Sequence, residues 1–177
     1  MVKCDITIPP GVPQIIITAE VDAPRVLVYR AYPEPELLVQ WLGPRHLSMT
    51  VERLEVRDGG RWHFTNSDLD GNAYAFHGVF HGQQSPERMV RTFEYEGAPA
   101  HVSLETLTIE KREGRSYLSA NAVYESVEDR DAMMQGGMED GVRQGFERLE
   151  ELLGRLMQGD TGAGQTTGAE HAARRAA

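Results

Sequence analysis

The sequence predicts an α+β domain in which a curved antiparallel sheet wraps around one long C-terminal helix. A β-branched run at residues 14–21, QIIITAEV, indicates a first strand. Turn signals then recur about every 10 to 15 residues through residues 47–126, which is typical of an antiparallel meander. A final set of apolar residues recurs at spacings of three and four, which predicts the helix: Met138, Val142, Phe146, Leu149, Leu153 and Leu156.

The elements between the first strand and the meander are two short helices. Residues 22–32, DAPRVLVYRAY, begin with Asp22 as an expected N-cap and Pro24 near the first turn. Residues 33–42, PEPELLVQWL, begin with prolines and are stopped by Gly43-Pro44. The six strands of the meander are then expected within residues 47–60, 61–66, 73–82, 88–97, 101–114 and 115–126.

The two ends of the chain are expected to lie outside the folded domain. Residues 1–13 carry three prolines and one glycine, so we expect a flexible lead-in. Residues 158–177 are rich in small and polar residues and should stay disordered, because they offer too little apolar surface to bury. The domain is therefore predicted to span residues 14–157.

Composition limits the classes of function. The chain has 177 residues, 40% of them hydrophobic, and a formal net charge of -9. An acidic chain disfavours nucleic acid and anionic membrane surfaces, since both attract basic patches. No apolar run approaches the roughly 20 residues of a membrane-spanning helix. The N-terminus shows no apolar signal segment and Cys4 is the only cysteine, so we expect a bacterial-type cytoplasmic protein without a disulfide.

Three glycines interrupt the long helix at Gly137, Gly141 and Gly145. Each glycine inside a helix costs up to about 1 kcal/mol relative to alanine. They permit either close packing of the helix on its neighbours or space for a ligand.

Trp41 also has two interpretations. It ends an apolar run, LVQW, directly before the Gly43-Pro44 break. It fits either a core position or the rim of a cavity, where it would contact a bound molecule.

Five segments in order resemble one protein family: residues 22–44, 56–64, 76–97, 102–110 and 124–153. The first carries the helix pair and its Trp-Gly-Pro corner, the second a Gly-Gly-aromatic strand start, and the third a hairpin with a Pro-Glu-Arg turn. The chain resembles the activator-of-heat-shock-protein-ATPase-like branch of the START-like superfamily (SRPBCC, polyketide cyclase/dehydrase). The resemblance implies the helix-grip (START/Bet v-like) fold, with a deep cavity under the long helix.

The resemblance implies less about activity. The superfamily includes lipid and hormone binders, cyclases, aromatase-like enzymes and co-chaperone domains. A shared fold hosts many functions, so function has to be argued from the site.

The sequence contains no standard catalytic or metal-binding motif. Cys4 lies in the lead-in, far from any histidine in the sequence. His63, His77, His81 and His101 fall on or beside expected strands, and His77 and His81 would lie about 13 Å apart, too far to share a metal ion. We therefore expect neither a metal site nor a cofactor.

Strand alternation predicts which polar side chains enter the interior. In residues 88–97, Arg91 shares a face with Met89, Phe93 and Tyr95. In residues 101–114, the same counting puts Glu105 on a face with Leu107 and Ile109. Two charges inside should pair, because an unpaired buried charge is costly. Alternatively, a bulge turns one or both toward solvent, or the pair is only structural.

Our first hypothesis is a binding module that holds a hydrophobic or aromatic small molecule between the sheet and the C-terminal helix. Arg91 and Glu105 would orient its polar groups. The other expected ligand-binding residues are Trp41, Trp62, Phe64, Phe76, Phe80, Tyr95, Tyr124, Met138 and Phe146.

Two alternatives remain open. A cyclase- or dehydratase-type enzyme would use the same cavity, with Glu105 or a histidine as the general base. A co-chaperone-like domain would bind a protein partner, which the family resemblance suggests and the residues do not independently support. Met133, Met134 and Met138 fit either a flexible pocket mouth or ordinary packing.

Overall fold

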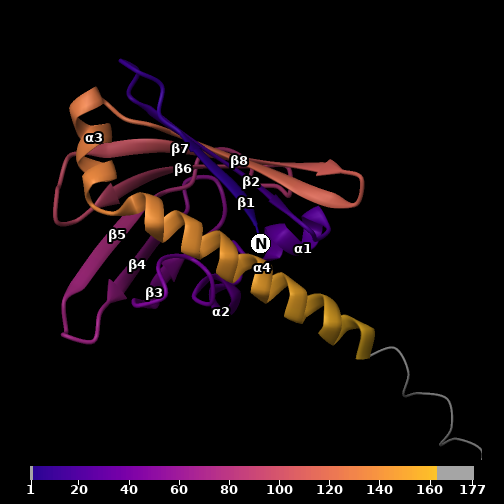
Figure 1. Cartoon of the computed structure of the whole chain (residues 1–177). Helices are drawn as coiled ribbons and strands as arrows, with labels where there is room; N and C mark the ends of the chain where they lie inside the picture. Colours follow the sequence, from indigo (N-terminus) through magenta and orange to yellow (C-terminus); the bar gives the residue numbers. More distant parts are fainter. Residues whose placement is uncertain (1, 163–177) are drawn as a thin grey trace, which may run out of the picture.

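The structure, a computed structural model, describes residues 2–162 and confirms the predicted α+β class. One antiparallel sheet has the strand order β1-β2-β8-β7-β6-β5-β4-β3 (Figure 1). Its strands are β1 (Lys3–Thr7), β2 (Gln14–Val21), β3 (Ser48–Leu54), β4 (Arg61–Ser67), β5 (Ala73–Val79), β6 (Arg88–Tyr95), β7 (Val102–Arg112) and β8 (Arg115–Val123). The helices are α1 (Arg25–Arg30), α2 (Pro35–Leu38), α3 (Val127–Gln135) and α4 (Met138–Gly162).

The chain order explains how the sheet comes to surround a helix. Consecutive hairpins link β3 through β8, and β8 returns to pair with β2. The segment with α1 and α2 carries the chain from β2 to the far edge at β3. Figure 1 shows α4 crossing in front of the sheet, with β3, β4 and β5 on one side of it and β7, β8, β2 and β1 on the other.

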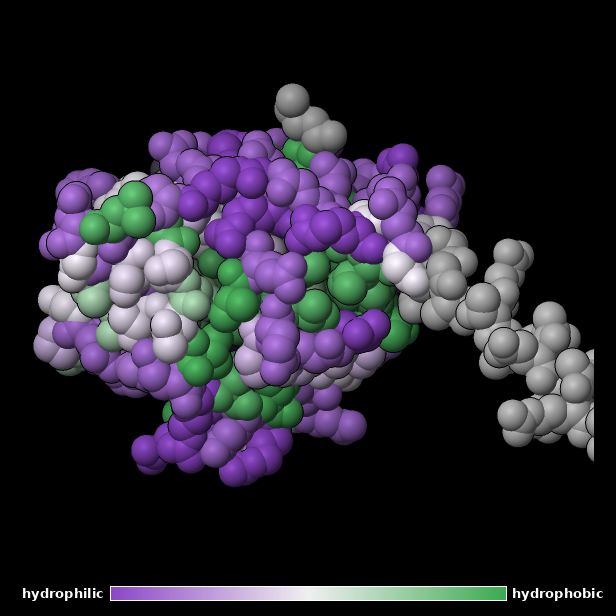
Figure 2. Space-filling model, turned by 90° about the horizontal axis from the view of Figure 1, so that it is seen from below, coloured by the Kyte–Doolittle hydropathy of each residue, from purple (hydrophilic) through white to green (hydrophobic). Residues whose placement is uncertain are grey.

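The main core lies between α4 and the inner face of the sheet, which is the face turned toward this helix. Leu118 and Leu149 are fully buried, and Ala19 and Leu153 are each 1% exposed. A second buried cluster, centred on Trp62, fills the space beneath β4, β5 and β6. Not every apolar side chain is enclosed, because Figure 2 shows a hydrophobic band reaching the surface between hydrophilic margins.

The prediction of a flexible lead-in at residues 1–13 is wrong for β1. Cys4 pairs with Ala19 and Ile6 with Ile17, so β1 extends the sheet beyond β2. An unpaired edge strand leaves its backbone groups without partners, and β1 supplies them for β2. Arg143 of α4 adds a hydrogen bond from Nη1 to the carbonyl oxygen of Cys4, at 2.8 Å.

The helix boundaries also differ from the prediction. Pro24, not Asp22, is the N-cap of α1, and no side chain caps that helix. The long helix is preceded by a separate helix, α3, whose N-cap Ser126 accepts a hydrogen bond from the backbone of Asp129. The only buried residue of α3 is Arg130, so no apolar periodicity marks this helix in the sequence.

The C-terminal boundary of the folded domain also differs from the prediction. The expectation of disorder from residue 158 is wrong for residues 158–162, which continue α4. Residues 163–177 lie outside the described residues.

Glycines of α4 pack closely against the segment after α2. A side chain at Gly145 would meet the carbonyl oxygen of Trp41 at 3.4 Å, and one at Gly141 would meet Pro44 at 3.7 Å. Gly137 has a φ of 79° and sits at the break between α3 and α4. These positions favour the packing interpretation for Gly141 and Gly145.

None of the helices within residues 2–162 has the length and hydropathy needed to cross a membrane.

Candidate functional site

Arg91 and Glu105 form an ion pair on the inner face of the sheet, as the alternation predicts. They are direct partners in the β6–β7 register, and Arg91 Nε lies 2.8 Å from Glu105 Oε2. Their side chains are 24% and 29% exposed, so solvent still reaches both. The β-bulge between Val51 and Arg53 of β3 lies on another strand and does not change their facing.

The guanidinium of Arg91 lies on an aromatic surface. Its Cζ is 4.5 Å from the ring centroid of Trp62 and 5.8 Å from that of Phe93. A cation over an aromatic face is attracted by the ring's quadrupole. Trp62 is itself fixed, because its indole N–H donates to the carbonyl oxygen of Thr92 at 3.2 Å. The position of Arg91 is therefore set from two sides, by a carboxylate and by a buried indole.

Two hydroxyl-bearing residues extend this polar group along the sheet. Ser103 is 2% exposed, and its Oγ has no hydrogen-bond partner within residues 2–162. Tyr124 directly follows β8 and is half-buried. Burial raises the pKa of the Tyr124 phenol, and the negative charge of Glu105 raises it further. The phenol thus lies within the electrostatic field of the Glu105 carboxylate.

Tyr32, which follows α1, interacts electrostatically with Arg91. Burial raises the pKa of its phenol, and the positive charge of Arg91 partly opposes that shift. Its ring meets Trp41 edge-on, with centroids 5.0 Å apart. The charge of Arg91 therefore reaches Tyr32, which packs against Trp41 in the core.

A row of aromatic rings continues from Trp62 across the inner face. Trp62 stacks on Phe64 at 5.0 Å, and Phe76 lies 5.3 Å from Phe93 and 5.1 Å from Tyr95. Phe76, Phe93 and Tyr95 are only half-buried, whereas Trp62, Phe64 and Phe80 are 1%, 5% and 2% exposed. The reachable end of the row is therefore on β5 and β6.

Three other expected ligand contacts lie away from this group. Trp41 is 4% exposed, and its indole N–H donates to the carbonyl oxygen of Ala31 at 2.8 Å. It packs against Phe146 of α4, with ring centroids 6.4 Å apart. Met138 is half-buried at the start of α4. Trp41 therefore has the contacts of a core residue, which favours the first of its two interpretations.

Phe93 and Ser103 belong to this group, but they are not among the ligand-binding residues expected from the sequence. Strand alternation predicts the inward facing of both, because Phe93 shares the face of Arg91 and Ser103 precedes Glu105 by two residues. The burial of the Ser103 hydroxyl carried no sequence signal, since serine is common on exposed strand faces.

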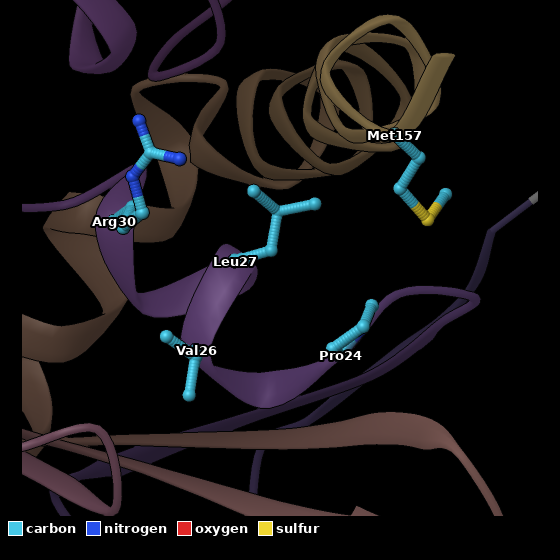
Figure 3. A pocket seen from close by; sticks show the side chains of 5 residues that line it. All are labelled: Pro24, Val26, Leu27, Arg30 and Met157. Carbon is cyan, nitrogen blue, oxygen red and sulfur yellow. The ribbon is translucent and has the colours of Figure 1, made fainter. Parts of the chain in front are cut away.

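Two surface hollows of the described residues lie elsewhere. One, of about 530 Å³, is lined by Glu20, Arg112, Glu113 and Arg115. The other, of about 320 Å³, lies between α1 and the end of α4, where Leu27 points toward the helix that carries Met157 (Figure 3). None of the residues that we expected to bind a ligand lines either hollow.

Two of the histidines, His63 and His77, lie together on the outer face, with ring centroids 6.5 Å apart. His63 contacts Glu52 at 3.1 Å and Glu96 at 2.9 Å, and His77 contacts Glu94 at 3.2 Å. His77 lies within β5, whereas His81 lies past its end. Within residues 2–162, no group of three or more His, Cys, Asp or Glu is placed to hold a metal ion.

A curved antiparallel sheet around a long C-terminal helix, with short helices after β2, is the helix-grip fold. A family model described as "Activator of Hsp90 ATPase homolog 1-like protein" matches residues 22–154. The chain belongs to this family, within the SRPBCC/polyketide cyclase-like fold. A comparison with curated proteins gives no match.

Solved structures support the same fold. A protein of Arthrobacter aurescens is 25% identical, with 85% of this chain and 91% of that chain covered and a TM-score of 0.78. A protein of Rhodobacter sphaeroides is 23% identical, with 87% and 100% covered and a TM-score of 0.79. CalU16 of Micromonospora echinospora is 20% identical, with 92% of each chain covered and a TM-score of 0.57.

Proposed function

We propose that this protein binds a small aromatic compound on the inner face of its sheet, around the Arg91–Glu105 pair. The pair itself carries the proposal, because it is a fixed and solvent-reachable polar group beside an aromatic row. Small-molecule sites commonly combine an apolar wall with a few convergent polar groups. Family membership is compatible with ligand binding and with cyclase-like chemistry.

The contacts follow from which side chains keep accessible surface. Phe76, Phe93 and Tyr95 would cover the rings of the compound, and Arg91, Glu105 and Tyr124 would hold its polar atoms. Trp62, Phe64 and Phe80 would support these residues from beneath. We favour ligand binding over catalysis as the function, because Arg91 already occupies one carboxylate oxygen of Glu105, the candidate base.

Isothermal titration with a panel of flavonoids, aromatic polyketides and fatty acids tests this proposal. We expect at least one aromatic member to bind, and Arg91→Met to weaken its binding at least about tenfold, or about 1.4 kcal/mol. Arg112→Met is the matched control. Arg112 also pairs with a glutamate, Glu110 at 2.8 Å, and lies 3.9 Å from the Tyr117 ring, but at the exposed end of β7.

Arg112→Met should leave the affinity unchanged. If no compound binds, or if both arginine substitutions weaken binding equally, the proposal is wrong.

A further inference from the structure

This inference rests on the proposed function and concerns the charge of the ligand. We infer that the site takes uncharged aromatic compounds that carry a hydrogen-bond acceptor beside a donor, and that Glu105 excludes carboxylates. The amide of an aromatic acid has this chemistry, as does a phenol next to a carbonyl group.

The hydrogen bonds left open by the pair define the polar part of the ligand. Arg91 donates a hydrogen bond from Nε to Glu105. Its other side-chain nitrogens make no hydrogen bond within residues 2–162. A guanidinium has five N–H donors, so its terminal nitrogens remain available for a ligand acceptor. Glu105 Oε1 is likewise without a hydrogen bond in the described part of the chain, and it would accept from a ligand donor.

The buried hydroxyl of Ser103 is a further polar group near Glu105 that lacks a hydrogen-bond partner within residues 2–162. Ser103 lies two residues before Glu105 on β7 and opposite Phe93 on β6. Its Oγ is buried without a partner among residues 2–162, although buried hydroxyls are ordinarily hydrogen-bonded. A polar atom of a ligand would complete it if the half-buried Phe93 moved aside, because the hydroxyl has no accessible surface of its own.

Charge balance separates neutral from anionic ligands. Glu105 already neutralises Arg91 at 2.8 Å, so the two side chains together carry no net charge. A carboxylate placed on Arg91 would also lie close to Glu105, and like charges at such distances repel. The charge of Glu105 also acts on Tyr124, where it raises the pKa of the phenol and so opposes formation of the phenolate.

Two probes of one shape test this inference by titration at pH 7: 2-naphthamide and 2-naphthoate. The wild-type protein should bind the amide at least tenfold more tightly than the carboxylate. Glu105→Gln should reverse this preference, because it removes the repulsion and releases Arg91 to pair with the ligand carboxylate.

Glu110→Gln is the matched control, since Glu110 lies on the same strand and pairs with Arg112. It should change both affinities less than twofold. Thermal melting of each variant establishes that it is folded before titration.

The outcomes separate this inference from the proposed function. Equal or tighter binding of naphthoate by the wild-type protein overturns the inference without any variant. A Glu105→Gln protein that is folded and binds the amide, but keeps the wild-type preference, overturns it as well. If neither probe and no compound of the wider panel binds, the proposed function itself is wrong.

Discussion

Arg91 and Glu105 face each other directly across β6 and β7, and Arg91 Nε lies 2.8 Å from Glu105 Oε2 above the ring of Trp62. Ion pairs on open surfaces contribute little to stability. This one is more than two-thirds buried on both sides, so the loss of one partner leaves a poorly solvated charge.

A double-mutant cycle should detect this coupling. Arg91→Met and Glu105→Gln should each lower the free energy of unfolding by about 1 to 3 kcal/mol. The double variant should lose less than the sum, with a coupling energy of about 1 kcal/mol. Urea unfolding at pH 7 measures all four proteins, and strictly additive losses would mean that the pair is not coupled.

The phenol of Tyr124 should titrate late. Burial, and then the charge of Glu105, raise its pKa above the ordinary value of about 10. The folded state therefore favours the protonated phenol, and this stabilisation is complete below pH 10 and is lost as the pH rises through the folded pKa. The titration of ¹³C-labelled tyrosine followed by NMR, with Tyr124→Phe for assignment, measures it.

Glu105→Gln should lower the pKa of Tyr124 while leaving it above the ordinary value, because burial remains. An unchanged pKa in this variant would show that the two groups do not interact.

Trp41 should behave as a core residue. Trp41→Phe removes the hydrogen bond to Ala31 and reduces contact with Phe146, so we expect a loss of about 1 to 3 kcal/mol in the free energy of unfolding. The affinity for an aromatic ligand should stay within twofold. Chemical denaturation and titration of the same sample compare the two quantities. Weakened binding with unchanged stability would instead place Trp41 at the ligand.

Gly78 should be intolerant of any side chain. A Cβ at this position would lie 2.0 Å from the Thr92 carbonyl oxygen and 2.7 Å from Trp62 Nε1. Gly78→Ala should therefore displace Trp62 and cost about 3 kcal/mol or more.

Gly154→Ala is the control for this substitution, because nothing lies within 4 Å of a Cβ there and alanine favours the helix by up to about 1 kcal/mol. Thermal melting compares the two variants. Similar melting temperatures would contradict the close approach of β5 and β6.

The inward facing of Arg91 and Glu105 was predictable, because it needs only the two-residue alternation within each strand. Both strands keep regular pairing from Arg88 to Glu94, so no bulge breaks the count. The placement of Arg91 over Trp62 was not predictable in this way. It depends on the mutual register of β4, β5 and β6, which turn lengths and packing decide together.

The two missed elements differ in what the sequence offered, because α3 lacks an apolar pattern whereas β1 carries one. α3 is held by the Ser126 cap and by hydrogen bonds from the Arg130 guanidinium to the carbonyl oxygens of Pro9 and Val12. In β1, apolar Cys4 and Ile6 alternate with polar neighbours, so strand alternation could have identified this edge strand despite the prolines that follow it. Polar contacts between distant residues stabilise α3, and sequence periodicity does not report them.

Intermolecular NOEs from a bound aromatic probe test the position of the ligand most directly. With ¹³C-labelled protein and unlabelled 2-naphthamide, we expect NOEs to the rings of Phe93, Tyr95 and Tyr124. NOEs to Leu27 and Met157 instead would place the probe in the hollow between α1 and α4, and would contradict the account.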